Sequence, residues 1–178
     1  MTRRQLEHII RAAGTIADTE HLIIVGSQSI LGQFPDAPVE LRQSNEADLY
    51  PRDDPSLADV IEGSIGELSP FHDTFGYYAQ AVGPETASLP TGWESRLIPV
   101  VGEATRGITG WCLEVHDLAL AKYAAGRDKD QEFTAALARH ELVDEATLRE
   151  RLTGMALDPR VRSLVEARIR RDFGSVTA

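Results

Sequence analysis

The apolar and polar positions at the start of the chain predict an amphipathic helix. Apolar side chains recur there at helical spacing, at Leu6, Ile9, Ile10, Ala13 and Ile16. Thr2 and Gln5 stand three residues apart, which is the spacing of a capping box at a helix N-terminus. We therefore expect a first helix that starts after Thr2, ends near Asp18, and buries one apolar face.

Two short strands are predicted next. The apolar run 22–25 is typical of a buried strand, and Gly26-Ser27 then ends it at a point where a short helix can open. Two prolines between residues 34 and 38 close that helix. A second strand, Glu46–Tyr50, ends at Pro51 because proline has no N–H to donate to a sheet.

The middle of the chain predicts a helix followed by three further strands. Residues 55–68 carry apolar side chains at helical spacing, and two glycines weaken the second half of that helix. Strand-like runs follow at 75–82, 96–101 and 109–115, with glycine and proline in the turns between them. Consecutive strands with short links predict an antiparallel meander added to the first two strands.

The remainder of the chain is predicted to be helical. Asp117 is expected to cap a helix over 118–125, which continues over 128–139. Asp144 is expected to cap a helix over 145–155, and Asp158-Pro159 predicts the start of a last helix over 160–173. The fold class is therefore α/β: a small mixed sheet flanked by helices, with a helical C-terminal half.

Length and composition predict a single domain over residues 1–178, with an α/β core at 1–115 and a helical part at 116–178 packed on it. No apolar run approaches the ~18 residues of a membrane span, and the first residues lack a secretory signal. Cys112 is the single cysteine, and we expect it to be a small buried hydrophobe in a cytoplasmic protein. The formal net charge of −10 opposes non-specific binding to nucleic acid, so an RNA substrate would need a local basic patch.

The candidate chemistry begins at the two predicted strands. Glu46 and Asp48 are two residues apart in a strand, so their side chains should point to the same face. If the strands are neighbours, Gly26 and Ser27 would place backbone N–H groups beside this pair of carboxylates. Such a turn can hold phosphate, and two carboxylates can bind the divalent cation that accompanies a nucleotide.

A cationic stretch follows in the predicted helices. Lys122 and Lys129 are seven residues apart and should project from nearly the same side, where a triphosphate would neutralise them. Arg127 adds a guanidinium suited to bidentate phosphate contact, and Asp130 could orient Lys129 or reach the metal. A solvated charged helix face is the alternative interpretation of these residues.

These two blocks carry a family resemblance. The Gly26-Ser27 turn followed by the acid-x-acid strand resembles the nucleotidyltransferase superfamily, which includes DNA polymerase beta. The stretch 116–133 resembles the corresponding helix of AbiEii-type toxin nucleotidyltransferases and their small bacterial relatives. The resemblance implies a minimal nucleotidyltransferase fold and transfer of an NMP from an NTP to a hydroxyl of tRNA or of a protein. It also implies a toxin–antitoxin context, with a cognate antitoxin as a possible partner.

The resemblance assigns roles to particular residues. Glu46 and Asp48 would bind Mg²⁺ or Mn²⁺, and Gly26 and Ser27 would contact phosphate. The nucleotide contacts from the later helix are assigned to Lys122, Arg127, Lys129 and Asp130. The sequence departs from the family pattern at Glu46, where aspartate is more common.

A third acid is also missing from the run 75–82, and Asp73, Glu94 and Glu114 are only loosely placed candidates. A non-catalytic protein of the same fold that binds a nucleotide or a partner is therefore the alternative function.

Other enzyme classes are less well supported. The chain has no G-x-x-x-x-G-K-[ST] loop of a P-loop NTPase and no G-x-S-x-G turn of a serine hydrolase. The pairs His72-Asp73 and His116-Asp117 raise a metal-dependent phosphohydrolase of the HD type. We expect the first pair in a loop and the second at a strand end, which does not suit that helical metal site.

Overall fold

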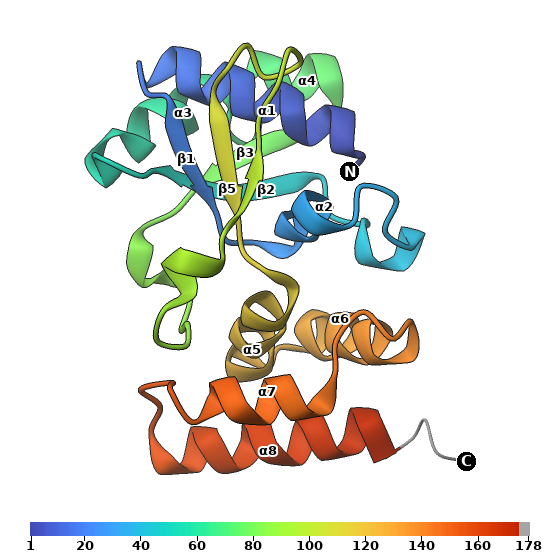
Figure 1. Ribbon diagram of the computed structural model, residues 1–178. Coiled ribbons are helices and arrows are strands. Elements are labelled where there is room, and N and C mark those ends of the chain that lie inside the picture. Colours follow the sequence, from blue (N-terminus) through green and yellow to red (C-terminus); the bar gives the residue numbers. More distant parts are fainter. Residues whose placement is uncertain (175–178) are drawn as a thin grey trace. The chain divides into compact units, whose positions relative to one another are not determined.

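The structure, a computed structural model, describes residues 1–174 and divides into two compact units (Figure 1). The sheet unit comprises Met1–Thr86 and Leu97–Leu113, and the helical unit comprises Ala87–Arg96 and the chain from Glu114 onward. The predicted single domain stays a prediction, and its residues 175–178 lie outside the described part.

The sheet unit contains one mixed sheet of five strands. They are β1 (His21–Ile24), β2 (Glu46–Pro51), β3 (Tyr78–Ala81), β4 (Ile98–Val100) and β5 (Thr109–Cys112). Their order across the sheet is β3-β2-β1-β5-β4. The central strand β1 is antiparallel to β2 and parallel to β5, while β2 and β3 are parallel and β4 and β5 antiparallel.

The predicted antiparallel meander is therefore wrong. Only β4 and β5 pair as such a hairpin, whereas β3 joins the opposite edge of the sheet, parallel to β2. The cause is the segment between β2 and β3, which contains α3 (Ala58–Ile65) and α4 (Pro70–Phe75). A helical crossover of this length brings the next strand back in the same direction, which a short turn cannot do.

Helices of the sheet unit cover one face of the sheet. The predicted capping box begins α1 (Arg3–Ile16), with the backbone N–H of Gln5 donating to the Thr2 hydroxyl. In Figure 1, α1 runs across the strands. A Cβ on Gly110 in β5 would lie 2.4 Å from Cδ1 of Ile10, so α1 packs closely on this face. The core here contains the fully buried side chains of Leu6, Ile9, Ile10, Leu22, Ile24, Ala47 and Leu49.

The helix predicted over 55–68 is divided in two. A 3₁₀ turn, Pro55–Leu57, precedes α3, and α3 ends before Gly66, whose N–H still bonds to the Glu62 carbonyl. Pro70 then begins α4, which takes up Phe75. Gly76 ends α4 with φ +73, a left-handed conformation that glycine adopts without steric cost. The next strand therefore starts three residues later than predicted.

In the part of the helical unit that the structure describes there are four main helices: α5 (Val115–Ala125), α6 (Asp128–Arg139), α7 (Glu145–Leu152) and α8 (Pro159–Gly174). Asp144 caps α7 as predicted, by accepting from the Thr147 N–H at 2.8 Å. The cap of α5 is Glu114 instead of Asp117, which lies inside the helix and is 0% exposed. These helices confirm the predicted α/β class with a helical C-terminal half.

Two further features of the chain bear on its chemistry. Cys112 is fully buried on β5, as predicted, and burial raises the pKa of its thiol to about 12. Within residues 1–174, no helix combines the length and apolar character needed to cross a bilayer.

Candidate functional site

The Gly26 turn lies directly against the Asp48 carboxylate. The Val25 N–H donates to the Asp48 carbonyl at 3.0 Å, so the predicted adjacency of the two strands is present. A Cβ built on Gly26 would lie 1.8 Å from Oδ2 of Asp48. Because Gly26 has an ordinary extended φ of −80°, the glycine is required by this close approach and not by backbone strain.

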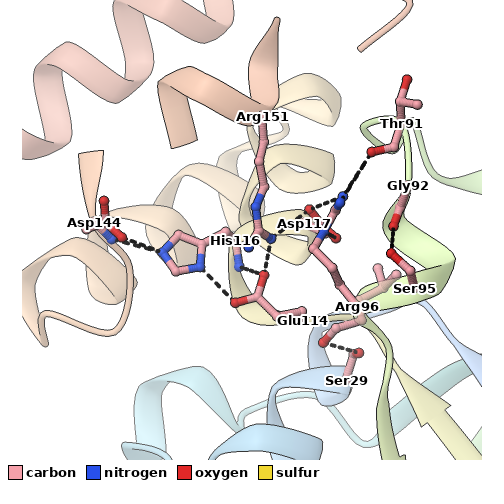
Figure 2. Close-up of polar contacts among 11 residues, drawn as sticks. Ser29, Thr91, Gly92, Ser95, Arg96, Glu114, His116, Asp117, Asp144 and Arg151 are labelled. Carbon is pink, nitrogen blue, oxygen red and sulfur yellow. Dashed lines mark hydrogen bonds and ion pairs between the residues drawn. The ribbon is translucent and has the colours of Figure 1, made fainter. Parts of the chain in front are cut away.

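The helix after Gly26 is shorter than predicted. It consists of a 3₁₀ turn, Ser27–Ser29, and the four residues of α2 (Ile30–Gln33). Such a short element provides little macrodipole, so any phosphate contact would rely on the N–H groups of the turn. The Ser29 hydroxyl donates to the Leu113 carbonyl at 3.3 Å and ties the turn to the residue after β5 (Figure 2).

Gln28 is a buried polar residue in the same turn. Its Nε2 donates to the Ser27 hydroxyl at 3.4 Å, so its carboxamide lies beside the predicted phosphate-binding serine. Its Oε1 has no hydrogen-bond partner within residues 1–174. A buried carbonyl oxygen without a hydrogen-bond donor destabilises the folded state. No sequence pattern indicates that this side chain is turned inward.

Glu46 and Asp48 occupy the same face of β2, as strand alternation predicts. Both are half-buried, and the residue between them, Ala47, is fully buried on the opposite face. On the adjacent strand β3, Tyr78 stands beside Glu46 and Gln80 stands beside Asp48. The polar surface around Glu46 and Asp48 is therefore built from two parallel strands, β2 and β3, and not from β2 alone.

Tyr78 makes a direct contact with the first of the two acids. Its hydroxyl donates to Oε2 of Glu46 at 3.1 Å. Burial and the negative charge of Glu46 together raise the pKa of Tyr78 to about 12. The tyrosine is therefore neutral at physiological pH and remains a hydrogen-bond donor to the carboxylate.

Within residues 1–174, no third acid joins this pair in a group that could hold a metal ion. The position beside Asp48 on β3 is Gln80, and of the three loosely placed candidates only Asp73 belongs to the sheet unit, exposed on α4. Glu94 and Glu114 belong to the helical unit. Within the described chain, no three His, Cys, Asp or Glu side chains are grouped to hold a metal ion.

Two carboxylates nevertheless fit a nucleotide-associated Mg²⁺. Protein sites for this ion commonly supply one or two carboxylates, and substrate phosphates and water complete the octahedron. Asp48 beside the Gly26 turn and Glu46 on the same strand face provide that donor set.

The predicted cationic residues belong to the helical unit, where they are arranged differently from the prediction. Gly126 has φ +65° and ends α5, and α6 starts at Asp128. Lys122 and Lys129 are thus on different helices, so the prediction of one continuous stripe is wrong.

Asp130 organises two of these cations. It is 1% exposed and lies 2.7 Å from Nε of Arg127 and 3.2 Å from Nζ of Lys122. Although burial raises the pKa of the Asp130 carboxyl, the Arg127 hydrogen bond and the Lys122 charge outweigh it and lower that pKa. Asp130 therefore orients Lys122 and Arg127, whereas the sequence suggests Lys129 or the metal as its partner. The side chain of Arg127 remains 61% exposed, and Lys129 is exposed.

A network of charged residues that sequence reasoning did not predict lies around the start of α5 (Figure 2). Asp117 receives a bidentate contact from Arg96, at 2.8 and 3.1 Å, and a further hydrogen bond from Arg151 at 3.0 Å. Arg151 also contacts Glu114. Burial raises the pKa of Glu114, but the contacts with His116 and Arg151 outweigh it and lower that pKa to about 2.

This network is structural in character, since the carboxylates of Glu114 and Asp117 are each paired with arginine. Nδ1 of His116 lies 2.8 Å from Glu114, and its Nε2 lies 3.1 Å from Asp144. The network joins the segment Ala87–Arg96 to α5 and α7 within the helical unit. Apart from the Glu114–His116 contact, the paired residues are separated by more than 20 residues in the sequence, so local patterns carried no signal for these contacts.

The HD-type phosphohydrolase is not supported by these positions. His116 lies in α5 and contacts carboxylates, while its neighbour Asp117 is paired with two arginines. His72 lies in α4, where its Nδ1 accepts from the Leu68 N–H at 3.1 Å, and Asp73 is exposed. Both histidines are thus on helices, contrary to prediction, but neither pair belongs to a cluster of metal ligands within residues 1–174.

Several arginines of α8 bind helix ends inside the helical unit. Arg168 donates to the Tyr123 carbonyl at 2.6 Å, and Arg162 donates to the carbonyls of Leu152 and Met155 at 2.7 and 2.6 Å. These side chains close the C-termini of α5 and α7, where carbonyl groups lack helical partners. Arg162 and Arg168 are thus used inside the helical unit, whereas Arg160 and Arg170 of the same helix are exposed.

A cavity of about 290 Å³ lies along α1 of the sheet unit. Its lining includes Arg4, His8, Arg11 and Tyr77. The His8 ring packs against Tyr77 and accepts or donates a hydrogen bond at 2.7 Å to the tyrosine hydroxyl. None of the eight predicted site residues lines this cavity.

A mixed sheet with a glycine turn pressed against a two-carboxylate strand is the arrangement expected of the nucleotidyltransferase superfamily. The chain belongs to the family described as nucleotidyltransferase of unknown function (DUF6036), whose model matches residues 4–171. No curated protein and no solved structure matches the chain. The superfamily resemblance is therefore confirmed at the family level.

Proposed function

We propose that the protein is a Mg²⁺-dependent nucleotidyltransferase that transfers an NMP from an NTP to a hydroxyl group of RNA or of a protein. The observation that carries this proposal is the contact between the Gly26 turn and the Asp48 carboxylate, with Glu46 on the same strand face. Family membership supports the reaction class and an NTP substrate. The resemblance of residues 116–133 to AbiEii-type toxins favours tRNA as the acceptor and a toxin–antitoxin context.

The reaction defines what the residues must do. The acceptor oxygen attacks the α-phosphorus, the bond to the bridging oxygen breaks, and pyrophosphate leaves while the hydroxyl proton passes to solvent or to a carboxylate. The bound cation would neutralise charge on the phosphate oxygens as it develops. Glu46 and Asp48 would hold that cation, and the N–H groups of the Gly26-Ser27 turn would donate to phosphate.

The cationic residues have a supporting role in this proposal. We propose that Arg127 and Lys129 contact the triphosphate, as the family resemblance of residues 116–133 implies. Lys122 is only 13% exposed and is held by Asp130, so we assign it mainly to keeping Arg127 and Asp130 in place. Asp130 then acts as the residue that orients Arg127.

The first prediction tests the metal role of Asp48. Asp48→Asn keeps the size of the side chain but removes its charge, and we expect transfer of label from α-labelled NTP to total RNA to fall at least 100-fold. Asp53→Asn is the matched control, because Asp53 is exposed just beyond β2. Transfer by Asp48→Asn at the rate of the control would contradict the proposed metal role.

The second candidate is a non-catalytic protein of the same fold that binds a nucleotide or a partner protein. The presence of Gln80, in place of an acid, beside Asp48 favours this alternative. Calorimetry with each NTP and Mg²⁺ separates the two, when it is combined with the labelling assay on RNA and on total protein. Nucleotide binding that depends on Asp48, without transfer to either acceptor, would favour the non-catalytic function.

A further inference from the structure

Glu46, the first residue of the acid pair, is contacted by Tyr78 of β3, which in turn packs on His72 of α4. The Tyr78 hydroxyl donates to Oε2 of Glu46 at 3.1 Å, and the Tyr78 ring packs on the ring of His72, with centroids 4.6 Å apart. The Leu68 N–H donates to Nδ1 of His72 at 3.1 Å, which holds the imidazole ring in place. A continuous set of contacts thus runs from the start of α4 to one oxygen of Glu46.

We propose that Tyr78 is a positioning residue for Glu46, and that its hydroxyl holds Oε2 so that Oε1 is presented to the divalent cation of the nucleotide. The inference rests on the proposed function, because it concerns the same acid pair. It adds a residue of β3 to a site that the sequence placed entirely on β2, the Gly26 turn and the later helices.

The need for such a residue follows from the length of the glutamate side chain. Glutamate has one more rotatable bond than the aspartate that is more common at this position in the superfamily. A half-buried glutamate on a strand therefore samples more positions of its carboxylate, and ordering it costs conformational entropy when a cation binds. A hydrogen bond from a rigid aromatic side chain removes much of that freedom before binding.

The register of the sheet explains why Tyr78 is suited to this task. β2 and β3 are parallel, and Tyr78 is the direct neighbour of Glu46 across the pair. The preceding residue, Tyr77, has the same chemistry, but its hydroxyl contacts His8 of α1 instead. The two tyrosines thus provide a test residue and a matched control on successive positions.

The experiment measures binding of Mn²⁺ by electron paramagnetic resonance, alone and with each NTP, and transfer is followed separately. We expect Tyr78→Phe to weaken Mn²⁺ binding about tenfold, as is typical when a residue that orients a metal ligand is lost. Tyr77→Phe should bind Mn²⁺ within about twofold of the wild-type protein, by the same reasoning. Circular dichroism confirms that each variant is folded at the temperature of the titration.

A double-mutant cycle shows whether Tyr78 acts through Glu46. Glu46→Asp shortens the side chain and removes the carboxylate from the reach of the hydroxyl, so Tyr78→Phe should then change Mn²⁺ affinity less than twofold. Equal losses in the two backgrounds would overturn the positioning role. The same conclusion follows if Tyr78→Phe binds Mn²⁺ as the wild-type protein does while Asp48→Asn does not bind it. Absence of Mn²⁺ binding by the wild-type protein with every NTP would overturn the proposed function as well.

Discussion

At the scale of single residues, close packing around Gly26 determines the geometry of the candidate site. The Asp48 carboxylate occupies the space that any other side chain at position 26 would need. Glycine at this point has two effects: it allows β1 and β2 to stay paired at the turn, and it lets the Asp48 carboxylate lie directly against the backbone of the turn. A single methyl group is therefore enough to perturb the site.

Replacing Gly26 by alanine tests this interpretation. The new Cβ would lie 1.8 Å from Oδ2 and 2.8 Å from Cβ of Asp48, so the carboxylate must move. We expect transfer or Mn²⁺ binding to fall at least tenfold and the free energy of unfolding to fall by about 1 to 3 kcal/mol. Urea unfolding and the metal titration measure the two effects.

Gly63→Ala provides the control for this substitution. A Cβ on Gly63 meets no atom within 4 Å, and the residue lies inside α3. Alanine there should stabilise the protein by up to about 1 kcal/mol and leave metal binding unchanged. If the two variants behaved alike, the close contact at Gly26 would have no functional meaning.

The contact between Gly26 and Asp48 was partly predictable. Alternation along a strand placed Glu46 and Asp48 on one face, and two short neighbouring strands placed a turn nearby. The role of Tyr78 was not predictable, because it depends on β3 lying parallel to β2. Pairing partners are chosen by contacts distant in the sequence, which a pattern read along one chain does not contain.

At the scale of elements, the corner between α5 and α6 depends on a few polar contacts. Gly126 takes the left-handed conformation that ends α5, and Arg168 of α8 donates to the Tyr123 carbonyl there. Asp130 then fixes Lys122 from α5 and Arg127 from the start of α6. The buried carboxylate thus joins two helices that the sequence predicted as one continuous surface.

Asp130→Asn is expected to destabilise this corner. Removal of the charge leaves Lys122, which is only 13% exposed, without its anionic partner, although solvent still screens the exposed Arg127. We expect the free energy of unfolding to fall by roughly 2 to 3 kcal/mol in urea titration. A loss of transfer with unchanged stability would indicate instead that Asp130 contacts the reactants.

The starts of some helices were predicted correctly and that of α5 was not, for a physical reason. The starts of α1, α7 and α8 follow from Thr2, Asp144 and Pro159, since capping is decided within four residues. Asp117 has the same local appearance as a cap, yet it is buried and paired with Arg96 and Arg151. A buried ion pair and a helix cap use the same residue type, and only the folded chain distinguishes them.

At the scale of the whole molecule, acidic residues outnumber basic ones, and the formal net charge is −10. In the helical unit, acids such as Glu114, Asp117 and Asp130 are paired with arginine or lysine. Many cations are thereby used inside the fold, and the protein as a whole repels nucleic acid. An RNA acceptor would need to be recognised by a small number of specific contacts.

The charge network predicts a pH dependence of stability. The pKa of Glu114 is about 2 in the folded protein, below its ordinary value of 4.5, so the unfolded chain binds a proton first as the pH falls. The contribution of Glu114 to the free energy of unfolding is complete above about pH 4.5. It is lost progressively as the pH falls toward 2, by roughly 3 kcal/mol in total. The lowered pKa of Asp130 acts in the same direction.

Urea unfolding at a series of pH values between 6 and 3 measures this effect. Glu114→Gln has no carboxyl group to titrate, so its free energy of unfolding should fall less steeply with decreasing pH than that of the wild-type protein. Parallel slopes for the two proteins would show that Glu114 is not the group responsible.

The burial of Cys112 has a practical consequence for spectroscopy. A thiol that is fully covered, and whose pKa is about 12, forms almost no thiolate at the pH at which maleimide dyes are attached. Since the chain has no other cysteine, one introduced on the surface of α4 would take up a fluorophore selectively without a cysteine-free background. The native core can thus be kept intact while the arrival of a nucleotide is followed in real time.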